Sequence, residues 1–277
     1  MLFVCSFSII SFIVSLWTSI SNDLLGNWYG FILLIIFFAV GFIVCLFLFL
    51  VIAYICTLKV DIEKEIDAPY KVYSKFCTQF AQMLCILSGV KTIVNGIEKI
   101  PSDTRFMLVS NHRSNLDPIV AMDKLRNYDL IFVSKIANMH IPVIGKFIHM
   151  AGYLAIDREN ARNAVKTINK AAEYIKNDAG SIAIYPEGTR TKGEKMIDFH
   201  PGSFKIAKKT NVPIVVTSIR GTEKCKYMFF NRSEVIIDII DVISAEEVKA
   251  SKTVELSEKA RSMIFNNLKS YGDKVEG

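Results

Sequence analysis

Charged side chains are nearly absent from the first 58 residues of this chain, which contain only Asp23. The remaining 219 residues carry all 33 lysines and arginines against 26 of the 27 acidic residues, a net charge of +7. A segment of this length is long enough to fold as one well-buried domain. We therefore divide the chain into a hydrophobic helical anchor at residues 1–58 and a basic globular domain at residues 59–277.

Cysteines and histidines with the spacing of a disulfide framework or a metal site are also missing. The six cysteines are scattered and include no CxxC pair; they occupy positions 5, 45, 56, 77, 85 and 225. His140, His149 and His200 lack metal-like spacing relative to each other or to Cys225. We expect a reducing compartment, no disulfide framework and no bound metal.

The motifs of several other protein classes do not occur. The chain contains no Walker loop, dinucleotide fingerprint, nucleophile elbow, internal repeat or low-complexity segment. Its basic residues are spread along the domain without a nucleic-acid-binding motif, so we expect no nucleic-acid partner. Attraction to anionic lipid headgroups explains the net charge more simply, although an ordinary solvated surface accounts equally well for any single lysine.

Two apolar runs occupy the anchor, at residues 2–20 and 28–56, with a short polar link between them. A helix needs about 20 apolar residues to cross a ~30 Å hydrocarbon core. The first run lacks the basic start and the cleavage site of a removed signal peptide. We predict a membrane-embedded helical hairpin that either spans the bilayer or enters from one leaflet. Lysines follow the second run and none lies in the link, which places the domain on the cytoplasmic side.

Short apolar runs alternate with helical patterns through the basic domain. Strands are predicted at residues 105–110, 130–134, 153–156, 181–185, 213–219 and 235–240. Helices are predicted at residues 69–87, 119–126, 136–149, 161–176, 203–209 and 255–270. This alternation predicts an α/β fold with a largely parallel central sheet flanked by helices. In such sheets, functional sites gather beyond the carboxyl ends of the strands.

A histidine and an aspartate follow the first predicted strand, where residues 111–117 read NHRSNLD. His112 and Asp117 would not share a face of a regular helix. Asp117 followed by Pro118, however, predicts a helix N-cap, which leaves His112 in a loop that can fold back. Asp117 would then hold one ring nitrogen while the other takes a proton from a hydroxyl. A capping aspartate beside an unrelated loop histidine explains the same residues equally well.

A second candidate loop follows the predicted strand at 181–185, where residues 185–190 read YPEGTR. Its glycine permits close backbone approach, and Arg190 suits two-point contact with a phosphate. An ordinary turn with a surface ion pair is the alternative. Lys135, Arg158 and Lys205 flank predicted elements and are further candidates for phosphate contact, with a plain surface role as the default for each.

Four blocks in order resemble the glycerolipid acyltransferase family, most closely the bacterial 1-acyl-sn-glycerol-3-phosphate acyltransferases. His112 to Asp117 matches the family's His-x4-Asp motif, and residues 187–190 (EGTR) are identical to its third block. Residues 152–158 (GYLAIDR) and 212–215 (VPIV) resemble the second and fourth blocks. The hydrophobic hairpin is also similar. One departure is His200-Pro201, because relatives often have basic residues there.

The resemblance implies transfer of a fatty acyl group from a thioester to the sn-2 hydroxyl of 1-acyl-glycerol 3-phosphate (lysophosphatidic acid). The product would be phosphatidic acid, in phospholipid biosynthesis. His112 would act as general base and Asp117 would orient it. No cofactor is implied; the partners are membrane lipids and the acyl donor, either acyl-CoA or acyl carrier protein. The residues expected at the acceptor phosphate are Arg190, Lys135, Arg158, Glu187, Gly188, Thr189 and Lys205.

Other functions stay open from the sequence. The same chemistry on glycerol 3-phosphate or on another lysophospholipid changes only the acceptor. Another possibility is a membrane protein that keeps the fold and binds phospholipid but catalyses no reaction. The intact pair of His112 and Asp117 argues against that last possibility, because binding does not need a base.

Overall fold

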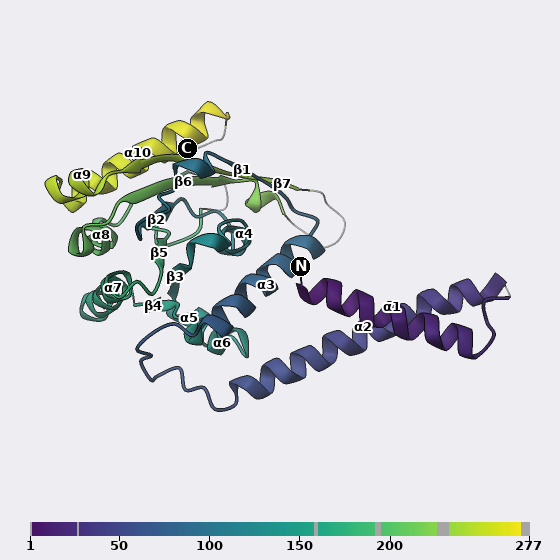
Figure 1. Cartoon of the computed structure of the whole chain (residues 1–277). Coiled ribbons are helices and arrows are strands. Elements are labelled where there is room, and N and C mark those ends of the chain that lie inside the picture. Colours follow the sequence, from purple (N-terminus) through teal and green to yellow (C-terminus); the bar gives the residue numbers. More distant parts are fainter. Residues whose placement is uncertain (1, 27, 158–159, 192–194, 226–232, 273–277) are drawn as a thin grey trace. The chain divides into compact units, whose positions relative to one another are not determined.

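The computed structural model describes residues 2–26, 28–157, 160–191, 195–225 and 233–272 (Figure 1). These residues fall into two compact units, Met1–Asp61 and Ile62–Gly277. The boundary predicted from the sequence, after residue 58, lies three residues earlier. The two units are described separately below.

The first unit is a pair of helices, α1 (Leu2–Ser21) and α2 (Trp28–Thr57), which pack against each other (Figure 1). Ser11, Ser15 and Ser19 are buried along one stripe of α1. A Cβ added to Gly41 of α2 would lie 3.4 Å from the Cα of Ser11, so small residues let the two backbones approach closely. Among the described residues, only the α2 segment Tyr29–Thr57 is long and apolar enough to cross a membrane; the apolar part of α1, Cys5–Ser21, is shorter.

The second unit is built on a seven-stranded sheet with the order β1-β7-β6-β2-β5-β3-β4. The strands are β1 (Lys91–Asn95), β2 (Met107–Ser110), β3 (Leu130–Lys135), β4 (Leu154–Ile156), β5 (Ser181–Ile184), β6 (Ile214–Arg220) and β7 (Glu234–Ile243). All neighbouring strands are parallel except β6 and β7. The carboxyl ends of β6, β2, β5, β3 and β4 therefore meet at one edge. The predicted α/β fold with a largely parallel sheet is confirmed.

The central strands are buried on both faces, because helices cover each side of the sheet (Figure 1). One side carries α3 (Lys71–Leu87), which packs against both α4 (Leu116–Lys124) and α6 (Ile144–Met150). The other carries α7 (Ala161–Lys176), α8 (Lys205–Thr210) and α10 (Thr253–Ser270). Continuous apolar strands such as 107–109, 182–184 and 214–216 suit this environment, since neither face meets water.

The predicted helix at residues 136–149 is wrong in one respect, because the structure has two helices there. They are α5 (Ile136–Met139) and α6, separated by residues 140–143, which include Pro142 and Val143. Proline disfavours helical geometry in the residue before it and cannot donate a backbone hydrogen bond. Val143 has a φ of +63°, which ends any continuous helix.

Two elements were not predicted, the strand β1 and the short helix α9 (Ala245–Ala250). Strand β1 is the outermost strand on one side of the sheet. Its side chains are only partly buried, and its apolar pattern is weak. Four short 3₁₀ turns complete the described elements: Ile97–Lys99, Arg126–Tyr128, Pro201–Phe204 and Thr222–Lys224.

We predict that Gly96→Ala destabilises the second unit by about 1–3 kcal/mol. Gly96 has a φ of +72°, and an added Cβ would lie 2.6 Å from the carbonyl oxygen of Ile239, so both backbone strain and a clash oppose the change. Thermal unfolding of the full chain in detergent, followed by circular dichroism, measures the effect. Gly202→Ala is the matched control, because nothing lies within 4 Å of its added Cβ. Equal midpoints for the two variants would contradict this account.

Candidate active site

His112 and Asp117 are in direct contact at the carboxyl end of β2. The Nδ1 atom of His112 lies 2.8 Å from Oδ2 of Asp117, whose side chain is fully buried. The backbone N–H groups of Arg113 and Ser114 donate to the same oxygen, at 2.6 and 2.8 Å. The loop therefore folds back around the carboxylate, in the arrangement predicted from the sequence.

The position of Asp117 in its helix differs from the prediction. Helix α4 begins at Leu116, with Asn115 at the N-cap, so Asp117 lies inside the first turn. A carboxylate is stabilised in the first turn because unpaired backbone N–H groups and the helix dipole both favour negative charge there. Asp117 thus accepts hydrogen bonds from the loop before the helix. Pro118 is the third residue of the helix and not the first, as had been predicted.

The geometry leaves one nitrogen of His112 for chemistry. Because Nδ1 faces a carboxylate, the neutral ring carries its proton there and Nε2 is the basic nitrogen. The side chain is 17% exposed, enough for a substrate hydroxyl to reach it. A histidine held in this way can take a proton from an alcohol and later return it to a leaving group.

An aromatic ring whose role was not predicted from the sequence supports the imidazole. Tyr185, at the end of β5, stacks on His112 with ring centroids 4.5 Å apart and an interplanar angle of 23°. Phe132 stacks on the far side of Tyr185, with centroids 6.5 Å apart. Burial raises the pKa of Tyr185 well above 10, with the negative charge of Asp117 acting in the same direction, so its phenol stays neutral. The stack restricts rotation of the His112 ring.

The loop after β5 holds the backbone of His112 from both sides. The N–H of His112 donates to Oε1 of Glu187 at 2.7 Å, and its carbonyl accepts from the N–H of Thr191 at 2.9 Å. The second Glu187 oxygen accepts from the N–H of Ile197 at 3.4 Å. Glu187 is buried, with 1% of its surface exposed. Its carboxyl group thus faces backbone donors near the histidine, which is a different position from contact with a phosphate.

Two further side chains hold the ends of neighbouring strands together. The amide of Asn111 both donates to the carbonyl of Ile219 and accepts from its N–H, at 2.9 and 2.8 Å. The hydroxyl of Thr222 donates to Oδ1 of Asp117 at 2.5 Å. Asn111 was visible in the sequence as the neighbour of His112. Thr222 was not singled out, although it follows a predicted strand.

The remaining predicted residues lie at varying distances along this edge of the sheet. Gly188, with a φ of +72°, precedes Thr189 and Arg190, which are exposed in the loop that contacts His112. Lys135 is exposed at the end of β3, two strands from β2. Lys205 is exposed at the start of α8. Arg158 lies outside the described residues. The structure thus brings together the histidine, the aspartate and the 187–191 loop.

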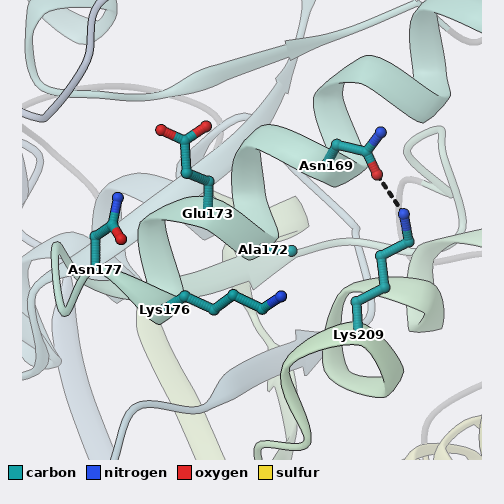
Figure 2. A pocket seen from close by; sticks show the side chains of 6 residues that line it. All are labelled: Asn169, Ala172, Glu173, Lys176, Asn177 and Lys209. Carbon is teal, nitrogen blue, oxygen red and sulfur yellow. Dashed lines mark hydrogen bonds between the residues drawn. The ribbon is translucent and has the colours of Figure 1, made fainter.

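A cavity of about 490 Å³ lies elsewhere, on the side of the sheet covered by α7 and α8 (Figure 2). Its lining residues are Asn169, Ala172, Glu173, Lys176, Asn177 and Lys209. Lys209 donates to the side-chain oxygen of Asn169 across it. None of the predicted site residues lines this cavity. Within the described ranges, no group of three or more histidine, cysteine or acidic side chains is arranged to hold a metal.

Comparison with known proteins relates this geometry to one family. Residues 91–220 match the sequence model of the family described as "Acyltransferase". The chain is 29% identical over 198 residues to the 1-acyl-sn-glycerol-3-phosphate acyltransferase of Saccharomyces cerevisiae, covering 70% of this chain and 65% of that protein. A chloroplastic enzyme of the same name from Brassica napus is 33% identical over 73% of this chain and 58% of its own length.

A bacterial relative and a solved structure extend the comparison. The Escherichia coli 1-acyl-sn-glycerol-3-phosphate acyltransferase is 28% identical over 60% of this chain and 68% of its own. The crystal structure of the 1-acyl-sn-glycerophosphate acyltransferase PlsC from Thermotoga maritima superposes with a TM-score of 0.58 at 24% identity, covering 75% and 81% of the two chains. That likeness establishes a shared fold. The chain spans somewhat less than two thirds of the yeast and plant proteins that it matches.

We predict that Glu187 makes stability depend on pH between about 4.5 and 7. Burial raises the pKa of its carboxyl group from 4.5 to about 7, although hydrogen bonds from the backbone of His112 and Ile197 oppose the rise. Across this window the unfolded chain ionises Glu187 while the folded protein keeps it protonated, so the free energy of unfolding falls as pH rises. The loss is complete above pH 7 and amounts to about 3 kcal/mol.

Comparison of Glu187→Gln with the parent protein isolates this effect, because glutamine does not titrate. We expect the unfolding midpoint of the parent to fall relative to that of the variant between pH 4.5 and 7. Glu258→Gln, at an exposed position on α10, is the matched control and should show a constant difference. A constant difference for Glu187→Gln as well would show that folding does not raise the pKa of this carboxyl group.

Proposed function

We propose that this protein, whose residues 91–220 match the sequence model of the acyltransferase family, transfers a fatty acyl group from a thioester to the sn-2 hydroxyl of 1-acyl-glycerol 3-phosphate. The product is phosphatidic acid. The observation that carries this proposal is the contact of 2.8 Å between Nδ1 of His112 and Oδ2 of Asp117 beside the EGTR loop. The relatives named above support the choice of acceptor.

The reaction needs a base, because the acceptor alcohol keeps its proton in water near neutral pH. Nε2 of His112 takes the proton of the sn-2 hydroxyl as the oxygen attacks the thioester carbonyl. The buried Asp117 keeps the opposite ring nitrogen protonated and stabilises the imidazolium that forms. A base positioned in this way contributes about 10²–10⁴-fold to the rate.

The tetrahedral intermediate then collapses towards products. The new carbon–oxygen bond remains, the carbon–sulfur bond breaks, and the imidazolium of His112 returns its proton to the departing thiolate. The acceptor proton is thus transferred to the thiol of the carrier, and no other reactant is required. Acceptor and donor bind together, so no acyl-enzyme intermediate forms. The acyl carrier is either coenzyme A or acyl carrier protein.

The acceptor phosphate requires a cation near the base. Arg190 is exposed in the loop whose next residue, Thr191, is hydrogen-bonded to His112. We assign it the main phosphate contact, with Gly188 and Thr189 shaping the loop. Lys135, Lys205 and Arg158 are supporting cations for the same headgroup. Glu187 has a different role in this proposal, because its carboxyl group accepts from the backbone of His112 and so positions the base.

Membrane association fits this substrate. The long apolar segment Tyr29–Thr57 supports attachment to a bilayer, and lysophosphatidic acid resides in one leaflet. Moving its acyl chain into water would cost about 0.8 kcal/mol for each exposed CH₂ group. A tethered enzyme reaches the headgroup without that cost. We place the second unit on the cytoplasmic side, because lysines follow the second apolar segment.

We predict that His112→Ala lowers kcat for acyl transfer by at least about 10²-fold while the protein stays folded and membrane-bound. The measurement is acyl transfer by the full chain in membranes, with lysophosphatidic acid and glycerol 3-phosphate each crossed with both donor types. His140→Ala, at an exposed position outside the site, is the matched control. An active His112→Ala enzyme would refute the base. Acyl transfer to glycerol 3-phosphate but not to lysophosphatidic acid would show that the acceptor is glycerol 3-phosphate. If the parent protein bound lysophosphatidic acid without any acyl transfer, a lipid-binding function would replace the proposed one.

We predict that Arg190→Ala raises the acceptor KM about 10- to 100-fold and changes kcat much less. A charge-assisted contact with phosphate is made in both the ground state and the transition state, so its loss weakens binding more than chemistry. Arg126→Ala is the control, because Arg126 lies before the amino end of β3, at the opposite edge of the sheet. An acceptor KM within twofold of the parent value would place the phosphate contact on another cation.

A further inference from the structure

Asp117 is held by two sets of donors, one on each carboxylate oxygen. Its Oδ2 atom accepts from the His112 ring and from two backbone N–H groups of the preceding loop. Its Oδ1 atom accepts from the hydroxyl of Thr222, at 2.5 Å. Both side chains are buried, with 0% of Asp117 and 1% of Thr222 exposed. A buried carboxylate oxygen without a donor is costly, so this hydroxyl has a specific function in the local structure.

The turn that carries Thr222 is held firmly in place. Gly221 has a φ of +92°, and an added Cβ would lie 2.2 Å from the carbonyl oxygen of Glu234 at the start of β7. Glu223 accepts from the N–H of Gly221 at 3.1 Å and pairs with Arg113 at 3.4 Å. The turn is therefore fixed to β7 on one side and to the loop after His112 on the other.

The sheet explains why this turn reaches the catalytic pair. Strand β6 is parallel to β2, and Thr217 of β6 lies in register with Ser110, the last residue of β2. The chain beyond β6 and the chain beyond β2 therefore emerge side by side. Asn111 adds two hydrogen bonds to Ile219, which keeps the two strand ends at a constant separation. Thr222 meets Asp117 because of this pairing.

We propose that Thr222 is a positioning residue for acyl transfer, acting through Asp117 to keep the His112 ring in the reactive orientation. This inference rests on the proposed function. An ionised carboxylate can only accept, so the threonine hydroxyl donates its hydrogen and fixes the rotation of the carboxylate plane. Without that hydrogen bond, the carboxylate can turn to share its oxygens among the remaining donors. Oδ2 then faces Nδ1 only part of the time, so the proton of the neutral His112 ring is no longer confined to Nδ1.

A positioning role differs from a purely structural one in what its loss changes. A structural threonine lowers stability when its hydroxyl is removed, but the folded molecules that remain work normally. A threonine that orients Asp117 lowers the rate of every folded molecule. It leaves the KM values for acceptor and donor unchanged, because Thr222 is buried behind Asp117 and touches neither.

The experiment compares matched hydroxyl deletions on the same strand and turn, in the full membrane-bound chain. Thr222→Val removes the hydroxyl and keeps the shape. Thr217→Val makes the same change at a buried threonine of β6 whose hydroxyl donates to the carbonyl of Val109, away from the catalytic pair. Activity is normalised to the folded fraction. We expect kcat to fall about 10- to 100-fold for Thr222→Val, with both KM values within twofold, and to stay within twofold for Thr217→Val.

Two further measurements test whether the effect passes through Asp117. Thr222→Ser retains the hydroxyl and should keep kcat within about threefold of the parent value. In the Asp117→Ala background, Thr222→Val should cost less than threefold, because the carboxylate that Thr222 contacts is already absent. Thr222→Ala replaces the valine variant if that protein does not fold.

Several outcomes would overturn the inference: an unchanged kcat for Thr222→Val, an equal loss for Thr217→Val, a tenfold loss for Thr222→Ser, or full additivity with Asp117→Ala. Absence of acyl transfer by the parent protein with every acceptor and donor is a separate result. It would refute the proposed function itself, whereas an active parent with an unaffected Thr222→Val variant would refute only the role of Thr222.

Discussion

A carboxylate that is fully removed from water must be surrounded by donors, and Asp117 takes its donors from two segments that are far apart in the sequence. The imidazole and two backbone N–H groups come from the loop after β2, and one hydroxyl comes from the turn after β6. Neither segment could satisfy both oxygens alone. The parallel pairing of β2 with β6 is therefore a requirement of the site as much as a feature of the fold.

Much of the fold follows from apolar patterning. Residues 107–109 and 182–184 are continuous apolar runs, and such runs are typical of strands that are buried on both faces. The predictions of strands and helices failed where the apolar pattern was weak or where neighbouring residues favoured different structures. The edge strand β1 mixes polar and apolar residues, and the break at Pro142 lies within a run with helical spacing. Strand order depends on contacts between distant segments, which no local pattern contains.

The site was predictable only in part for the same reason. His112 and Asp117 are close in sequence, so their contact could be anticipated from the residues around them. Tyr185 and Thr222 reach the pair only because β5 and β6 lie on either side of β2 in the sheet. The role of Glu187 was also hidden, because its sequence neighbours suggested an anion-binding loop. Burial and the N–H of His112 instead make this carboxyl group part of the support for the proposed base.

The two hydrogen bonds that the backbone of His112 makes with the 187–191 loop also have a consequence for selectivity. They connect the backbone of the proposed base to the loop that carries the proposed phosphate-binding arginine. The backbone separation of the two residues then limits the distance between the hydroxyl and the phosphate of an acceptor. In glycerol phosphates, the sn-1 oxygen is one carbon further from phosphorus than the sn-2 oxygen. Under the proposed function, an acceptor is therefore selected by the number of bonds that separate its hydroxyl from its phosphate.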